Sequence, residues 1–118
     1  MTLREALAEV SAQILCGEDE ELDSPVQTAA AGDLMSDILA RLGTPDVLLT
    51  GLTTNQMIRT CAVSGIRSVL VVRDKPVDES IVELAREEDI VLAVTKLSLF
   101  AASGRLYVRG MRSGTSGD

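Results

Sequence analysis

The chain has 118 residues, of which 46% are hydrophobic and 25% are charged, so it is long enough for one soluble domain with a real core. Its formal net charge of −7 argues against nonspecific binding to nucleic acid or anionic membranes, because both need a cationic surface. The sequence has no His, which removes the commonest general base and most zinc sites.

Cysteine usage and hydropathy favour a cytoplasmic protein. Cys16 and Cys61 do not form a CxxC motif, and we interpret them as free thiols in a reducing compartment. No segment reaches the roughly 18 apolar residues of a transmembrane helix, and no signal-peptide pattern precedes the first helix. We expect no catalytic residues, no metal and no cofactor.

The first predicted element is an amphipathic helix from about Leu3 to Leu15. Thr2 and Glu5 have the spacing of a capping box at its start, and Gly17 is its predicted end. The apolar stripe of this helix needs a cover. Either the domain's own sheet or the same helix of a second copy provides it.

An acidic segment from Gly17 to Pro25 follows and is interpreted as a solvated linker. Its carboxylates lack the spacing of a calcium loop. Residues 1–25 are therefore predicted to form an N-terminal helix and acidic linker, outside an α/β domain that spans 26–110.

Val26 to Ala31 is predicted as a weak strand, and it leads into a helix that Gly43 closes. Asp33 lies at or near the start of this helix, four residues before Asp37. The pair can be interpreted as a cation or acid–base site, or as a cap plus a carboxylate that the helix dipole stabilises.

The stretch from Asp46 to Val72 is predicted to form a strand, a helix and a second strand. Val47–Leu49 and Val69–Val72 are short apolar runs, typical of strands covered on both faces. Thr53 and Gln56 have capping-box spacing at the start of the helix, and Gly65 is its predicted left-handed end.

The remaining chain continues the alternation of strands and helices. We expect a helix from Asp78 to about Glu88, a strand at Ile90–Val94, a short helix from Thr95 to Gly104 and an edge strand at Leu106–Val108. Residues 111–118 are predicted to be a flexible tail. The predicted fold is α/β, three-layer-like, with a mainly parallel sheet of four to five strands, flanking helices and the N-terminal helix.

Ligands of such sheets bind beyond the carboxyl ends of the strands. Those ends carry hydroxyl groups, helix N-terminal amides and cations that suit a small anion or phosphate. A plain set of turns and caps is the alternative, since no phosphate-loop motif is present. The candidate ligand residues are Asp33, Gly51, Thr53, Thr54, Arg73 and Lys75.

Four segments of the sequence resemble DRTGG-domain proteins: AGDLMSDILA (Ala31–Ala40), LLTGLTTNQMIRT (Leu48–Thr60), LVVRDKP (Leu70–Pro76) and ELAREEDIVLAVTKLSLFAASGRLY (Glu83–Tyr107). Within that family, the sequence resembles the small stand-alone DRTGG proteins encoded beside iron-only and other redox hydrogenases. The resemblance implies a fold similar to the N-terminal domain of HPr kinase/phosphorylase. It also implies a homodimer without activity of its own, associated with a hydrogenase or another redox complex.

The sequence departs from the motif that names this family. Leu52-Thr53 replace the usual Asp-Arg after the Thr-Gly turn, and Val72-Arg73-Asp74 replace the usual Thr-Gly-Gly. What the resemblance implies therefore concerns fold, regulation and assembly, and no ligand role tied to the motif is carried over.

Overall fold

The computed structural model describes residues 1–40 and 44–113. It contains one sheet of five strands in the order β1-β5-β4-β3-β2. The strands are β1 (Gln13–Cys16), β2 (Ala29–Ala31), β3 (Val47–Thr50), β4 (Ser68–Val71) and β5 (Val91–Val94). β2 to β5 are parallel neighbours, whereas β1 pairs antiparallel with β5. The predicted mainly parallel sheet of four to five strands is confirmed.

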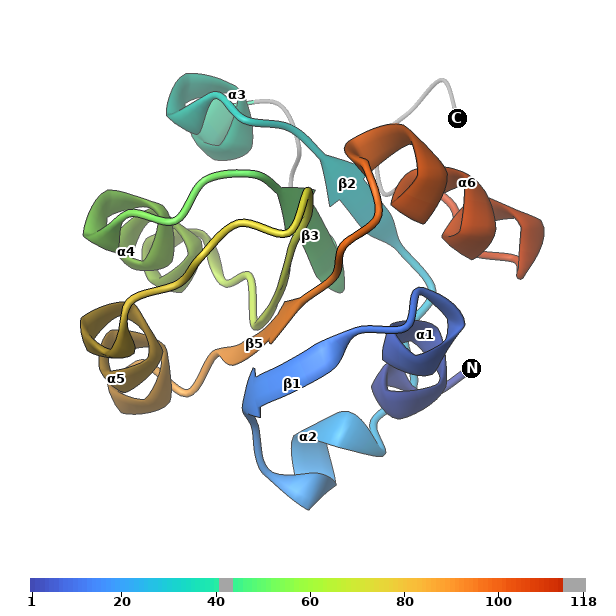
Figure 1. Cartoon of the computed structure of the whole chain (residues 1–118), viewed down its shortest axis with the longest axis horizontal. Helices are drawn as coiled ribbons and strands as arrows, with labels where there is room; N and C mark the ends of the chain where they lie inside the picture. The colour runs from blue at the N-terminus through green and yellow to red at the C-terminus, as the bar shows by residue number, and fades with distance from the viewer. Residues whose placement is uncertain (41–43, 114–118) are drawn as a thin grey trace.

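Helices cover both faces of the sheet (Figure 1). One face carries α3 (Met35–Ala40), α4 (Asn55–Ser64) and α5 (Glu79–Glu87), and the other carries α1 (Leu3–Glu9) and α6 (Leu99–Val108). The short helix α2 (Asp19–Leu22) packs beside α1. The result is the predicted three-layer α/β architecture.

The side chains of each central strand alternate between two cores. Leu49 and Leu70 pack with α1 and α6, whereas Leu48 and Val69 pack with α4 and α5. Because both faces are covered, the strands need apolar residues at successive positions, which is why they appear as continuous runs in the sequence.

The N-terminal helix is shorter than predicted. It ends at Glu9, and Gln13–Cys16, which the Leu3–Leu15 prediction included, form the edge strand β1. Ser11 has a left-handed φ of 52°, which breaks the helix and turns the chain toward β5. Backbone pairing along the free edge of β5 therefore outweighs the helical periodicity. The stripe of α1 is buried against the chain's own sheet, the first of the two covers considered.

The acidic segment is not a plain linker. Its middle forms α2, in which Glu18 and Glu21 make a reciprocal capping box and Leu22 is buried. Arg4 of α1 holds this helix by ion pairs to Asp19 at 3.1 Å and Asp23 at 3.0 Å. A run of carboxylates thus carries one buried apolar residue, Leu22, which packs with α1 while Arg4 pairs with the carboxylates.

The C-terminal region also differs from the prediction. α6 begins after Ser98, whose hydroxyl accepts the Ala101 N–H at 3.1 Å, and it continues through Leu106–Val108, which were predicted as an edge strand. Gly104 lies within this helix and does not end it. Leu106 is buried in the α1/α6 core, and this packing outweighs the helix-weakening effect of the glycine.

The first residues of the predicted tail are packed. Met111 is buried, and Arg112 forms a parallel bridge with Thr28 beside β2. The predicted helix end at Gly43 and the tail residues 114–118 lie outside the described residues. The division of the chain at residues 25 and 110 stays a prediction.

Two other boundaries agree with the sequence analysis. Gly65 ends α4 in the left-handed conformation with φ of 80°, and Asp78 precedes α5 in its N-cap position. Within residues 1–40 and 44–113, no helix is long and apolar enough to cross a membrane.

Candidate functional site

Three turns meet at the edge of the sheet where the parallel strands end. Asp33 follows β2, Gly51 follows β3 and Arg73 follows β4. These strands are parallel neighbours, so their carboxyl ends lie side by side. This edge is where ligands bind in many α/β proteins, and it is the one predicted from the sequence.

The carboxylate of Asp33 is the centre of this cluster. The Gly51 backbone N–H donates to its Oδ1 at 2.7 Å, and the Thr50 hydroxyl donates to the same atom at 3.1 Å. Arg73 Nη2 donates to Oδ2 at 3.0 Å. One carboxylate therefore joins the ends of three strands, and we call these four residues (Asp33, Thr50, Gly51 and Arg73) the rim cluster.

Gly51 is needed because the Arg73 guanidinium lies over it. A Cβ built at position 51 comes 1.8 Å from Arg73 Nη2, which no side chain tolerates without a shift of the guanidinium. The glycine thus lets the cation reach Asp33 across the end of β3. The sequence predicted a turn here but gave no reason for glycine.

The turn after β4 holds Arg73 in place through its backbone. Arg73 and Asp74 both have left-handed φ angles, 69° and 54°. Their N–H groups donate to the carbonyls of Leu97 at 2.8 Å and Thr95 at 3.0 Å. These bonds to the segment after β5 support the unusual backbone conformation from which the Arg73 side chain extends.

The rim cluster favours the ionised form of Asp33. The Gly51 N–H is the largest cause of the lowered pKa of Asp33, and the bonds from Arg73 and Thr50 lower it further, against an opposing effect of partial burial. The side chains of Asp33 and Arg73 are 38% and 39% exposed. The ion pair is therefore formed at a surface that solvent reaches.

The structure brings together Asp33, Gly51 and Arg73 of the six predicted ligand residues. Thr54 has a different task, because its hydroxyl accepts the Met57 N–H at 3.2 Å and caps α4. The capping residue is thus Thr54, not the predicted Thr53, which is half-buried. Lys75 is exposed, two residues after Arg73.

Asp33 lies near the start of α3 as predicted, but its bonds differ from those of a cap, and Thr50 was not among the six candidate residues. Asp33 lies two residues before α3, and the bonds of its carboxylate run to the ends of β3 and β4. Thr50 is fully buried at the end of β3. A polar residue at the end of an apolar strand was the sequence signal that could have identified Thr50.

Among the described residues, no three Asp, Glu, Cys or His side chains gather to hold a metal ion.

The end of β5 is closed in another way. Thr95 is buried, its hydroxyl donates to the Val10 carbonyl at 2.7 Å, and its oxygen accepts the Leu97 N–H at 3.2 Å. The hydroxyl thus ties β5 to the end of α1 and does not face solvent.

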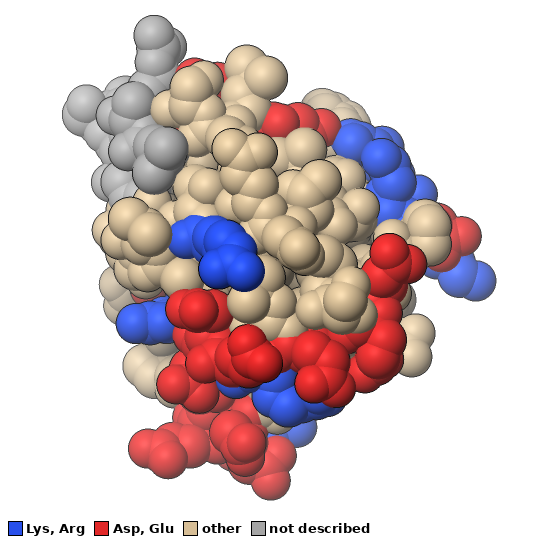
Figure 2. Space-filling view, turned by 90° about the vertical axis from the view of Figure 1, so that its left-hand side faces the viewer, with Lys and Arg blue, Asp and Glu red and all other residues tan. Residues whose placement is uncertain are grey.

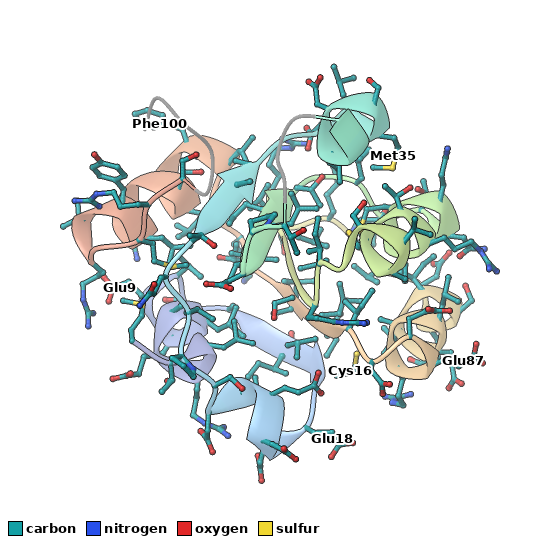
Figure 3. All side chains as sticks on the ribbon, turned by 180° about the vertical axis from the view of Figure 1, so that it is seen from behind. Glu9, Cys16, Glu18, Met35, Glu87 and Phe100 are labelled. Atoms are coloured by element: carbon teal, nitrogen blue, oxygen red, sulfur yellow. The ribbon has the colours of Figure 1, made fainter. Side chains whose placement is uncertain are left out.

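The two thiols are poor nucleophiles. Both are free and buried, and Figure 3 shows Cys16 between β1 and α5, inside the molecule. Burial raises the pKa of Cys61 to about 11 and also raises the pKa of Cys16. At neutral pH both remain protonated, which disfavours thiolate chemistry.

Comparison with solved structures identifies a protein of the same fold. The structure of the CBS and DRTGG domains of the regulatory region of Clostridium perfringens pyrophosphatase, complexed with its activator diadenosine tetraphosphate, superimposes with a TM-score of 0.73 at 17% identity. The match covers 96% of this chain and 51% of that chain, so this chain spans about half the length of its structural neighbour.

No protein-family model matches the sequence, and a search of curated proteins gives no match. At 17% identity, the structural likeness concerns the fold. The chain therefore has the α/β fold found in the CBS and DRTGG regulatory region of that pyrophosphatase.

Proposed function

We propose that the chain is a non-catalytic regulatory or assembly module of the DRTGG type that acts as a homodimer. The observation that carries this proposal is the rim cluster. At the edge where an α/β enzyme would place reacting groups, the arginine, the carboxylate and the hydroxyl bond one another and join three strands. Such an arrangement stabilises a scaffold.

The fold likeness supports the regulatory part of this proposal. The structural neighbour is a regulatory region of a pyrophosphatase, and its match extends over nearly the whole of this chain. A domain of this kind changes the behaviour of a partner through contacts, so its own surface is where function is to be sought.

The outer face of α6 is the candidate surface for self-association. Phe100 is 88% exposed and Val108 is 83% exposed, and their spacing of eight residues places them on one helix face with Gly104 between them. Figure 3 shows Phe100 at the periphery of the molecule. Large apolar side chains exposed together are typical of interaction sites.

Light scattering coupled to size exclusion tests the dimer. We expect a dimer for the native chain at micromolar concentration and a monomer for Phe100→Asp combined with Val108→Asp. Val63→Asp is the matched control, because Val63 is 83% exposed on α4, on the other side of the sheet. A monomeric native chain contradicts the homodimer, and a monomeric Val63→Asp variant moves the interface to α4.

The proposed partner is a hydrogenase or another redox complex, on the basis of the sequence resemblance. Figure 2 shows acidic side chains gathered where α5 and α2 lie, so a protein partner with a basic surface fits this side better than nucleic acid does. Copurification from the native host at low and high salt tests it. Recovery of hydrogenase subunits supports the proposal, and recovery of the chain alone contradicts it.

A small-ligand sensor is the second candidate, favoured by the donors that converge on the rim cluster. A backbone N–H, a hydroxyl and a guanidinium that all donate to one carboxylate are a set of donors that suits an anion. Thermal unfolding with diadenosine tetraphosphate, the activator of the structural neighbour, tests this candidate. A melting temperature that rises with ligand concentration supports sensing, and no shift at millimolar concentration contradicts it.

A further inference from the structure

We propose that the Asp33 carboxylate is an internal substitute for an external anion, and that a phosphate-bearing ligand binds the rim cluster by taking its place. This inference deepens the second candidate function, on which it rests. The site consists of Thr50, Gly51 and Arg73, and Asp33 is the group that the ligand exchanges with.

The geometry of the donors supports exchange. Oδ1 of Asp33 receives two donors at 2.7 Å and 3.1 Å, and Oδ2 receives the guanidinium at 3.0 Å. A phosphate presents oxygen atoms with the same acceptor character and more charge. Two of the donors are placed without Asp33, since Thr50 and Gly51 are buried at the end of β3, and the backbone that carries the Arg73 guanidinium is bonded to the segment after β5.

The carboxylate is also the replaceable member of the cluster. Asp33 belongs to the connection between β2 and α3, and 38% of its side chain is exposed, so it can turn into water without opening the core. Lys75 is exposed two residues after Arg73, so a ligand with more than one negative charge would meet a second cation in this segment of the chain. Anion binding would then release the β2–α3 connection from the ends of β3 and β4.

Exchange predicts that removal of the carboxylate strengthens anion binding. We expect Asp33→Ala to bind inorganic pyrophosphate at least about tenfold more tightly than the native chain, which corresponds to one charge-assisted interaction. Asp33→Asn serves as a second variant if the alanine variant does not fold, because its amide oxygen still accepts the Gly51 N–H. Titration calorimetry at fixed ionic strength measures the affinities.

A change of net charge alone must not produce this effect. Asp89→Asn is the matched control, since Asp89 is exposed before β5, at the opposite edge of the sheet, and asparagine tolerates its left-handed φ of 56°. We expect the control to bind like the native chain. Asp33→Ala combined with Arg73→Gln is expected to lose the added affinity, because the principal cation is gone.

The outcomes separate the two ideas. Tighter binding by Asp33→Ala, or by Asp33→Asn where the alanine variant does not fold, together with a shift of the Gly51 amide resonance on binding, supports exchange. If the native chain binds pyrophosphate and the Asp33 variants bind no better, exchange is wrong and sensing stands. If neither the native chain nor any variant binds, both are wrong. If Asp33→Asn and Asp89→Asn gain the same affinity for pyrophosphate, the gain comes from the change of net charge alone, and exchange is wrong.

Discussion

The carboxyl ends of the parallel strands are held by two kinds of side-chain bond, one at the end of β5 and another at the ends of β3 and β4. At β5, a neutral hydroxyl is buried and bonded to the Val10 carbonyl 85 residues away in sequence. At β3 and β4, an ion pair with about two-fifths of each side chain exposed lies over a glycine. The first kind belongs to the core, and the second is in contact with water. Only the second can respond to a dissolved anion or to pH.

Thr95→Val breaks the buried bond and has the largest expected effect on stability. Valine keeps the shape but removes the hydroxyl, which leaves the Val10 carbonyl buried without that partner, at a cost of about 1–3 kcal/mol in the free energy of unfolding. Urea denaturation measures the change. Thr60→Val on α4 is the control, expected within about 0.5 kcal/mol of the native chain. If both variants lose the same free energy of unfolding, the buried bond of Thr95 has no special importance for stability.

Gly51→Ala disturbs the exposed ion pair and has a smaller expected effect. The added Cβ displaces the Arg73 guanidinium, whose flexible end can move aside, so we expect a loss of about 1 kcal/mol from the weakened bond to Asp33. Gly104→Ala is a control of opposite sign. Apart from its chain neighbours and the backbone of α6, no atom of the described residues lies within 4 Å of a Cβ at position 104. Alanine in the exposed middle of α6 is therefore expected to stabilise by about 0.5–1 kcal/mol.

If Gly51→Ala is as stable as the native chain, the approach of Arg73 over the glycine has no energetic importance. A loss in Gly104→Ala would point instead to a contact made by the outer face of α6. That result would be informative, because Gly104 lies between Phe100 and Val108 on the proposed dimer surface.

The pH dependence of stability gives the smallest effect. The pKa of Asp33 is lowered on folding, so the unfolded chain binds more protons between the lowered value and the unfolded one, and stability rises with pH there. The contribution is complete above the unfolded value, about pH 4, and is lost as pH falls through the folded one. Exposure of the pair keeps it small.

Asp33→Asn isolates this contribution from those of other carboxylates. The pKa of Glu5 is also lowered, by the Thr2 cap, and remains so in the variant. We therefore expect the native chain to lose more stability than Asp33→Asn when unfolding is measured from pH 5 to pH 2, in steps chosen around the ionisation of aspartate. Identical pH profiles would mean that Asp33 is not stabilised in its ionised form.

The central sheet was predictable because its signal is local. Val47–Leu49, Val69–Val72 and Ile90–Val94 are apolar runs bounded by turns, and burial on both faces allows few other placements. The N-terminal error had a non-local cause. Residues 13–16 continue the helical period, and only the free edge of β5, some 80 residues later in the chain, makes them a strand.

The candidate site was predictable in position but not in its bonding. The rule for strand ends pointed to Gly51 and Arg73, whereas their link through Asp33 depends on β2 lying beside β3. The capping-box spacing of Thr53 and Gln56 predicted Thr53 as the cap, whereas Thr54 caps α4 in the structure. The choice between them depends on where α4 begins, and that is set by packing of Met57 and Ile58 against the sheet.

The short strand β1 also protects the molecule from aggregation by strand pairing between copies. It covers the outer side of β5, and its irregular register between Ile14 and Cys16 makes it a poor template for another strand. On the opposite side, β2 has only three residues and is flanked by the Thr28–Arg112 bridge. A proteolytic cut that released residues 1–16 would leave the outer side of β5 unpaired. The remaining part of the chain would then be prone to form fibrils by strand pairing between molecules.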